Sequence, residues 1–189
     1  MSDDASTSEW LDEQAQNNPA WQEWARPERI AAQVDRLFAA TLPAVPGVPP
    51  MPEADRYSDT MLNWVADAFE HLLPDGDALT EPDNADLADQ FVCYIGETLR
   101  QRAGGEWFNE SFQDGSVLYG MRFTPAIGYR HGASPDDITD WLFRAVEADD
   151  GPDFFLEIGT EIYSRAIAYA DAHGLPHDLR EVREQHGLA

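Results

Sequence analysis

The chain has 189 residues, of which 43% are hydrophobic, and its 36 acidic residues against 12 basic ones give a formal net charge of -24. This apolar content can form the core of one domain of ordinary size, which excludes a wholly disordered chain. The charge argues against nucleic-acid binding and against docking on anionic lipid, because both need a basic face.

Three explanations of the acidity stay open. All 12 basic residues are arginine, so the charge can follow from a preference for arginine codons together with a need for solubility. It can also mark adaptation to high salt. The third explanation is an acidic face that meets a basic protein, where complementary charge steers association. The identity of such a partner and the oligomeric state stay open.

The polar segment 1–26 is predicted to be partly mobile, ahead of a single α+β domain over residues 27–189. It nevertheless contains Trp10, Trp21 and Trp24, and three large aromatic residues are unusual in a disordered tail. They favour a short helix that clasps the body of the protein, with a partner-binding peptide as the alternative. No secretion signal and no apolar run of membrane-spanning length is found, so we expect a cytoplasmic protein.

Two helices are predicted on either side of a Pro-rich linker at 43–52. Pro27 is expected in the first turn of a helix that runs to about residue 41, and the prolines of the linker cannot continue it. Ser58 is expected to cap a second helix, over about 59–73. The buried stripe of this second helix is predicted to be Met61, Leu62, Val65, Phe69 and Leu72.

Residues 74–89 contain closely spaced acids, and we expect a turn-rich loop with a solvated acidic surface. The alternation resembles a calcium-binding loop, but the ligand order of an EF-hand is absent, so no metal is expected. The acids of this segment are Asp75, Asp77, Glu81, Asp83, Asp86 and Asp89.

A central helix, buried on most sides, is predicted over residues 85–103, because its apolar positions cover more than one stripe. Asn84 is expected to cap it, and Gly104 can supply the left-handed residue that ends it. Cys93 is expected to be a small buried hydrophobe rather than a nucleophile. Gly96 costs about 1 kcal/mol relative to alanine inside a helix, which the close approach of another backbone would explain.

The hydrophobic period changes after residue 105. Three short runs rich in aromatic and β-branched residues predict a three-stranded antiparallel meander, with a hairpin signal at Asp114-Gly115. These runs are EWFNESF, SVLYGMRF and AIGYRHG.

Two helices are predicted to pack at the C-terminal side. Ser134 and Pro135, followed by acids, are typical of a helix start, and this helix should turn Ile138, Trp141, Leu142, Ala145 and Val146 inward. A longer helix is expected over about 153–172, ended by His173-Gly174, with a short final helix after it. The fold class is therefore α+β.

No signature of phosphate, dinucleotide or zinc binding is found, and no cofactor is expected. His173 and His177 are four residues apart, but a glycine and a proline lie between them, which disfavours a metal site. Glu97 and Arg100 lie three residues apart on the central helix and can form an ion pair. The alternative places Tyr94, Glu97 and Arg100 in a cleft beside Trp107, as an enzyme or a small-ligand-binding site.

The stretch from Tyr94 to Trp107 reads YIGETLRQRAGGEW. It resembles a group of uncharacterised bacterial proteins in which a helix with Tyr-x-Gly-Glu runs into Gly-Gly-x-Trp. The resemblance covers residues 87–146, including TPAIGYRHGASPDDITDWLFRAV, and carries no catalytic residues. Such proteins often resemble small cytoplasmic immunity or accessory proteins encoded beside bacterial toxins or secretion systems. The matching residues are Tyr94, Gly96, Glu97, Arg100, Gly104, Gly105 and Trp107.

The leading prediction is a non-enzymatic, acidic protein-interaction module. It would act as an immunity-type inhibitor that docks on a basic toxin or enzyme. The expected contact surface combines the acids Asp75, Asp77 and Asp83 with exposed aromatic residues.

Overall fold

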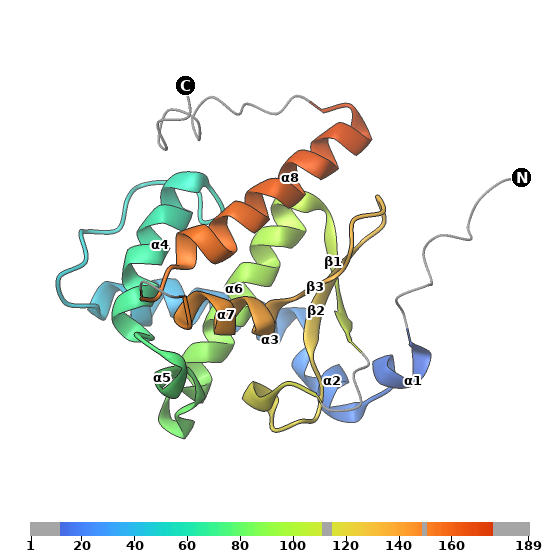
Figure 1. Ribbon diagram of the computed structural model, residues 1–189, viewed down its shortest axis with the longest axis horizontal. Coiled ribbons are helices and arrows are strands. Elements are labelled where there is room, and N and C mark those ends of the chain that lie inside the picture. The colour runs from blue at the N-terminus through green and yellow to red at the C-terminus, as the bar shows by residue number, and fades with distance from the viewer. Residues whose placement is uncertain (1–11, 111–114, 149–150, 176–189) are drawn as a thin grey trace, which may run out of the picture.

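The computed structural model describes residues 12–110, 115–148 and 151–175, which form an α+β fold (Figure 1). Helix α6 (Ala85–Ala103) runs through the middle of the molecule, and the other elements pack around it. A small antiparallel sheet lies against one side of this helix. Its strand order is β1 (Gly105–Asn109), β2 (Pro125–Tyr129) and β3 (Asp136–Asp137).

The central helix has the burial that its sequence predicts. Phe91, Val92, Tyr94 and Ile95 are all fully buried although they point in different directions around the helix axis. Gly104 adopts a left-handed conformation with φ of +62° and ends the helix, as expected for a C-terminal glycine. Strand β1 starts at the next residue, so the sheet is tied directly to the end of the central helix.

The N-terminal part consists of α1 (Glu13–Gln16), α2 (Pro19–Trp24) and α3 (Pro27–Arg36). Helix α3 continues as a π-helical turn over Leu37–Thr41 and a 3-10 turn over Leu42–Ala44. Trp21 and Trp24 are each only 5% exposed and belong to the main hydrophobic core. This burial agrees with a helical clasp. Trp10 lies outside the described residues.

Helix α4 (Asp59–Leu72) begins as predicted, because the Ser58 hydroxyl accepts a hydrogen bond from the Met61 N–H. The same hydrophobic cluster contains Phe38, before the Pro-rich segment 43–52, and Phe69, after it. The core therefore extends across both sides of that segment.

The expectation of a turn-rich, solvated loop over 74–89 is wrong in part. Helix α5 (Gly76–Thr80) forms there because the Asp75 carboxylate accepts a hydrogen bond from the Ala78 N–H. A 3-10 turn (Pro82–Asn84) then leads into α6. Asn84 stands at the start of α6 but does not cap it. Its side-chain amide donates to the Ala78 carbonyl at 2.9 Å and so holds α5 against the start of α6.

The sheet has three antiparallel strands, but the middle run of the predicted meander is not one of them. SVLYGMRF forms a 3-10 turn (Val117–Tyr119) and a loop, and β1 pairs directly with β2 in the register Trp107↔Ile127. Gly120 and Met121 both adopt positive φ, and this backbone bends away from strand geometry. Asp114 of the predicted hairpin turn lies outside the described residues.

The third strand comes from the segment expected to start a helix. Asp136 and Asp137 pair with β2, and the helix α7 (Ile138–Val146) begins one residue later than β3 ends. Asp137, not Ser134, is its cap and accepts hydrogen bonds from the Thr139 and Asp140 N–H groups. The inward face of α7 is as predicted, with Ile138, Trp141, Leu142, Ala145 and Val146 buried.

Helix α8 (Thr160–His173) follows a π-helical turn over Phe155–Gly159 and crosses α6, and left-handed Gly174 ends it (Figure 1). The predicted final helix lies outside the described residues. Among the helices that the structure describes, none combines the length and the apolar character that a bilayer crossing requires.

Candidate functional site

The four residues predicted to share a cleft are only partly brought together. Tyr94 is fully buried, and its hydroxyl donates to the Arg56 carbonyl at 2.9 Å. Its ring packs against those of Phe38 and Tyr57. Burial raises the pKa of the Tyr94 phenol well above its usual range. Tyr94 is therefore a core residue held away from solvent.

Glu97, Arg100 and Trp107 do lie together. The Glu97 carboxylate accepts two hydrogen bonds from Arg100 Nη1 and one from Trp107 Nε1, all at 2.9 Å. A hollow of about 200 Å³ beside them is lined by Arg100 and Trp107 but by neither Tyr94 nor Glu97. The Glu97 carboxylate therefore holds the Trp107 indole and the Arg100 guanidinium together at the end of the central helix.

Gly96 explains why the indole fits there. A Cβ built on Gly96 would lie 2.0 Å from Trp107 Cη2, so a side chain larger than hydrogen would collide with the ring. We expected the backbone of another segment to approach Gly96 closely. That expectation is wrong, because the group that approaches it is the side chain of Trp107. The stretch from Tyr94 to Trp107 thus joins the central helix to the sheet through one packed tryptophan.

The ten described arginines leave little positive charge free. Nine of them form ion pairs with carboxylates, and Arg122 instead donates to the Tyr119 carbonyl and lies over the Phe123 ring. The paired arginines are Arg26, Arg29, Arg36, Arg56, Arg100, Arg102, Arg130, Arg144 and Arg165.

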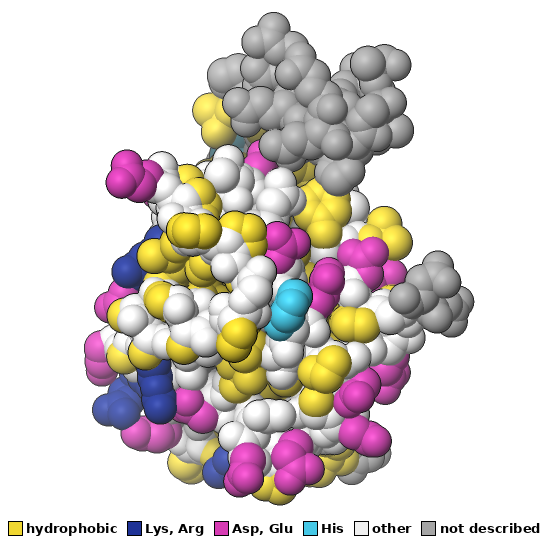
Figure 2. Space-filling model, turned by 90° about the vertical axis from the view of Figure 1, so that its left-hand side faces the viewer, with side chains coloured by type: hydrophobic (Ala, Val, Ile, Leu, Met, Phe, Trp, Pro, Cys, Tyr) yellow, Lys and Arg dark blue, Asp and Glu magenta, His cyan; other side chains and the backbone are white. Residues whose placement is uncertain are grey.

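Described carboxylates without an arginine ion pair occur on several parts of the molecule, and eight of them lie where the end of α4, helix α5, the end of α7 and the start of the turn before α8 meet. We call this surface the acidic face; it comprises Asp67, Glu70, Asp75, Asp77, Glu81, Asp83, Glu147 and Asp153. Figure 2 shows acidic side chains along the lower and right-hand parts of this side of the molecule.

Two observations show that members of the acidic face are close neighbours. The pKa of Glu70 is raised by burial first and then by the charges of Asp153 and Asp67. A Cβ built on Gly76 would lie 3.1 Å from Glu147 Oε1, which places the end of α7 beside the start of α5. Of the predicted acids, Asp75 caps α5, Asp77 lies in its first turn, and Asp83 is exposed in the following 3-10 turn.

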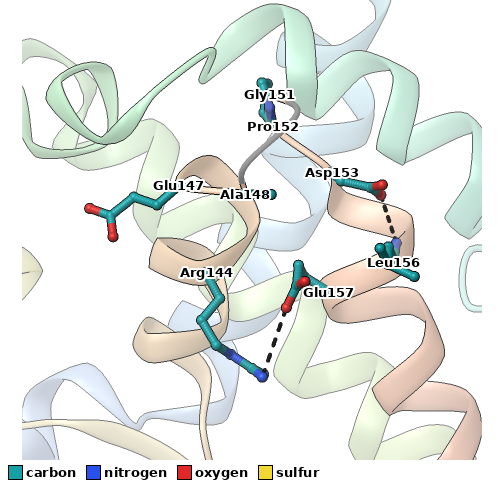
Figure 3. Close-up of a pocket in the computed structure, with 8 residues that line it drawn as sticks. All are labelled: Arg144, Glu147, Ala148, Gly151, Pro152, Asp153, Leu156 and Glu157. Atoms are coloured by element: carbon teal, nitrogen blue, oxygen red, sulfur yellow. Dashed lines mark hydrogen bonds and ion pairs between the residues drawn. The ribbon is translucent and has the colours of Figure 1, made fainter.

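A groove of about 590 Å³ borders the acidic face between α7 and the turn before α8 (Figure 3). Arg144 and Glu157 reach toward one another across it, with Arg144 Nη1 3.9 Å from Glu157 Oε2, while Glu147 points away (Figure 3). Asp153 accepts the Leu156 N–H at 2.7 Å, and the Leu156 side chain is 59% exposed. The groove therefore combines acids with one exposed apolar side chain.

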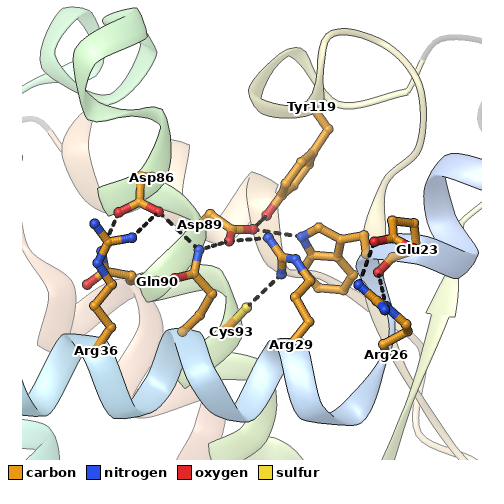
Figure 4. A network of polar contacts seen from close by, with 11 residues as sticks. Glu23, Arg26, Arg29, Arg36, Asp86, Asp89, Gln90, Cys93 and Tyr119 are labelled. Carbon is orange, nitrogen blue, oxygen red and sulfur yellow. Dashed lines mark hydrogen bonds and ion pairs between the residues drawn. The ribbon is translucent and has the colours of Figure 1, made fainter.

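Asp89 has many hydrogen-bond partners in the structure, although its sequence position did not predict this. Asp89, expected in a solvated surface, is 7% exposed and accepts hydrogen bonds from Trp24 Nε1, Tyr119 Oη, Arg29 Nη2 and Gln33 Nε2 (Figure 4). Its contacts tie α2, α3 and the 116–123 loop to the central helix. The only sequence signal was its position in the apolar pattern, beside Ala88 and Phe91.

Cys93 lies one turn after Asp89 and is fully buried. Arg29 Nη1 is 3.6 Å from its sulfur, yet burial dominates and raises the pKa of the thiol. A protonated, buried thiol is a poor nucleophile, so Cys93 has the structural place that its sequence context predicts.

The histidines of the C-terminal region do not assemble into a metal site among the described residues. The rings of His131 and His173 lie 6.3 Å apart, and burial together with His173 and Arg165 lowers the pKa of His131. No group of three or more potential metal ligands is found in the described part of the chain. His177 lies outside it.

No family model, no curated protein and no solved structure significantly matches this chain. The resemblance carried by Tyr94 to Trp107 therefore stays a prediction, and the site rests on the geometry alone.

Proposed function

We propose that this chain is a non-enzymatic interaction protein that binds a basic protein partner through the acidic face. The observation that carries the proposal is the separation of charge. Nine of the ten described arginines are paired with carboxylates, whereas the members of the acidic face form no ion pair with a described arginine, although Arg144 lines the adjoining groove with Glu147 and Asp153. A partner that brings lysine or arginine to this face relieves the mutual repulsion of these carboxylates.

The groove next to the acidic face supports a specific contact rather than a diffuse attraction. Its exposed Leu156 offers apolar area, and interfaces owe much of their affinity to apolar contacts surrounded by polar ones. An immunity-type inhibitor of a basic toxin or enzyme would use this arrangement by covering the partner's basic active surface. The activity of the bound partner should then fall in proportion to occupancy.

The experiment compares two matched variants against a partner captured by the full chain and then purified. The face variant carries Asp67→Asn, Asp77→Asn and Glu147→Gln, and the control carries Glu13→Gln, Glu28→Gln and Glu53→Gln. All six side chains lie on the surface, and each variant removes three charges. The face variant should lower the association rate constant several-fold to about tenfold, because charge steering acts mainly on association.

The control variant should keep an association rate close to that of the unmodified chain. The affinity of the unmodified chain should fall as salt is raised, with a smaller dependence in the face variant. Equal association rates for the two variants, or an affinity that does not change with salt, would contradict the proposal.

The second prediction, a small-ligand site or enzyme built on Tyr94, Glu97 and Arg100, has weaker support. The Tyr94 phenol is buried, and the Glu97 carboxylate already accepts three hydrogen bonds from Arg100 and Trp107. The hollow lined by Arg100 and Trp107 is open to solvent beside them.

A further inference from the structure

The turn between β2 and β3, residues 130–135, contacts the C-terminal end of α8 through the ring of His131 (Figure 1). The centre of this ring lies 5.7 Å from that of Tyr169 and 6.3 Å from that of His173, and both contacts are edge-on. On the side of the sheet it packs against Tyr129, at 5.3 Å. One imidazole therefore connects the sheet to the last two turns of α8, residues 167–173.

The same two turns of α8 are packed onto the end of the central helix by Tyr169. A Cβ built on Gly104 would lie 2.4 Å from Tyr169 Cε2, so the phenol ring lies directly over that glycine. His173 packs on the Tyr169 ring at 4.2 Å, and its Nδ1 donates to the Tyr169 carbonyl at 2.8 Å. The side chains of His131, Tyr169 and His173 form one group, which we call the ring cluster.

Helix α8 has a second attachment to the sheet, one turn before the ring cluster. Arg165 donates to both carboxylate oxygens of Asp136 in β3, at 2.6 and 2.8 Å. Asp136 also accepts from Tyr129 Oη at 2.8 Å, and burial raises the pKa of Tyr129, so this hydroxyl stays protonated and neutral. The ion pair can therefore hold the earlier part of α8 in place independently of the ring cluster.

The ring of His131 is placed to be neutral. Its Nε2 atom is buried and has no hydrogen-bond partner in the described part of the chain. A neutral imidazole can carry its single proton on Nδ1, which leaves no donor at Nε2 to satisfy. Protonation puts an N–H donor and a positive charge there, and a buried donor without an acceptor is costly.

The charges that act on His131 also oppose its protonation. Burial is the largest cause that lowers the pKa of His131, followed by the charges of His173 and Arg165 on α8. At the end of α6, Arg102 is paired with Asp59. A positive imidazole in the ring cluster would therefore meet repulsion from α8.

Carboxylates on the surrounding elements do not offset this repulsion. Asp136 of β3 is paired with Arg165, and Glu106 of β1 is paired with Arg130 of the turn itself. Asp171 of α8 is exposed and is not among the charges that shift the pKa of the imidazole. Protonation thus adds repulsion at this joint without adding an ion pair.

We propose that His131 is a pH-sensitive latch, whose neutral ring holds residues 167–173 of α8 against the β2–β3 turn and whose protonation releases them. Release separates the Tyr169 ring from Gly104, while the ion pair of Arg165 with Asp136 keeps the earlier part of α8 in place. The acidic face is built from α4, α5, α7 and the turn before α8, so this device goes beyond the proposed function.

The direction of the pH effect follows from the pKa of His131. This pKa is lowered in the closed joint and returns toward its ordinary value of about 6.5 when the joint opens, so the open form takes up a proton more readily. The latch should be fully closed above about pH 6.5 and should weaken as pH falls through that value.

The test is amide hydrogen exchange of the full chain at pH 7.5 and pH 5.0, with the intrinsic rate at each pH divided by the observed rate to give a protection factor. Protection of residues 167–173 should fall about threefold to tenfold at the lower pH, relative to that of residues 91–95 in the central helix. NMR of the ring protons should show His131 titrating below about pH 6.5. An unchanged protection ratio would overturn the proposal, and this measurement needs no substitution.

Substitutions then identify the group that titrates. His131→Phe keeps a ring in the cluster but cannot take up a proton, so it should abolish the difference in protection between the two pH values. His131→Gln is also uncharged and should do the same without a new aromatic ring. The matched control is His71→Gln, at an exposed position in the last turn of α4, which should keep the full pH dependence.

His173→Gln separates the two histidines of the ring cluster. Without the charge of His173, His131 should titrate at a higher pH, and the loss of protection in acid should become smaller but persist. A pH dependence that remains in His131→Phe, or that disappears in His173→Gln, would assign the titration to another group and overturn the latch.

Discussion

The indole of Trp107 occupies the space that a side chain on Gly96 would need, with 2.0 Å between a Cβ built there and the ring atom Cη2. The same indole donates from Nε1 to Glu97 and packs edge-on against Trp24 at 5.1 Å between ring centres. One tryptophan thus joins the central helix, the first strand and the N-terminal clasp. Its position depends on the absence of a methyl group at residue 96.

The first prediction concerns that methyl group. Gly96→Ala should destabilise the fold by about 1–3 kcal/mol through overpacking, although alanine in a helix interior normally stabilises by about 1 kcal/mol. Urea unfolding gives the free energy directly. In a Trp107→Ala background the same change should become neutral or favourable. A Gly96→Ala cost that persists in that background would refute the steric account.

A second prediction concerns the buried carboxylate of Asp89. Asp89→Asn leaves Arg29 without its counter-charge in a site where the Asp89 side chain is 8% exposed, so a loss of about 3–5 kcal/mol is expected. The matched control is Asp86→Asn, whose ion pair with Arg36 is exposed and should contribute less than about 1 kcal/mol. Similar unfolding midpoints for the two variants would contradict the central role of Asp89.

The pH dependence of stability provides a third test, at Glu110. Its folded-state pKa, raised to about 7, lies above the value of about 4.3 for an unfolded glutamate, so the folded chain binds this proton more tightly. The contribution of Glu110 to stability is therefore complete below about pH 4.3 and is lost as pH rises through about 7. Glu110→Gln should flatten the decrease in stability between about pH 5 and 8. A steeper decrease in the variant would reverse the assigned sign.

A fourth prediction is that the acidic face lowers the stability of the isolated protein. Burial and the charges of Asp153 and Asp67 raise the pKa of Glu70, so Glu70→Gln should stabilise the fold at pH 8. Added salt should stabilise the unmodified chain more than this variant, because screening weakens the same repulsion. Thermal unfolding at low and high salt measures both effects, with Glu28→Gln as the exposed control.

Local structure was predicted correctly where the residue type at one position largely determines the backbone conformation there. Ser58 caps α4, Gly104 ends α6 in a left-handed conformation, and the inward face of α7 follows its helical spacing. The helix start predicted at Ser134 and Pro135 is wrong, although these residue types are typical of one. Pairing of Asp136 and Asp137 with β2 carries the chain on as a strand and moves the cap to Asp137.

Less of the candidate site could be predicted from the sequence. Asp75, Asp77 and Asp83 were found as exposed acids, but their neighbours Glu147 and Asp153 come from a part of the chain more than sixty residues away. Tyr94, placed beside Glu97 by helical spacing, instead faces Arg56 and the core. Spacing along a helix predicts which residues share a turn, but not what another element places against them.

The sequence by itself determined the α+β class, the central helix and the acidity, because these follow from composition and from short-range periodicity. Only the tertiary structure decided which carboxylates are neutralised, which are buried and which remain free. Asp89 and Asp83 are six residues apart in one acidic segment, yet one is enclosed by four donors and the other is exposed. The free energy of a charge depends on its surroundings, and distant segments supply them.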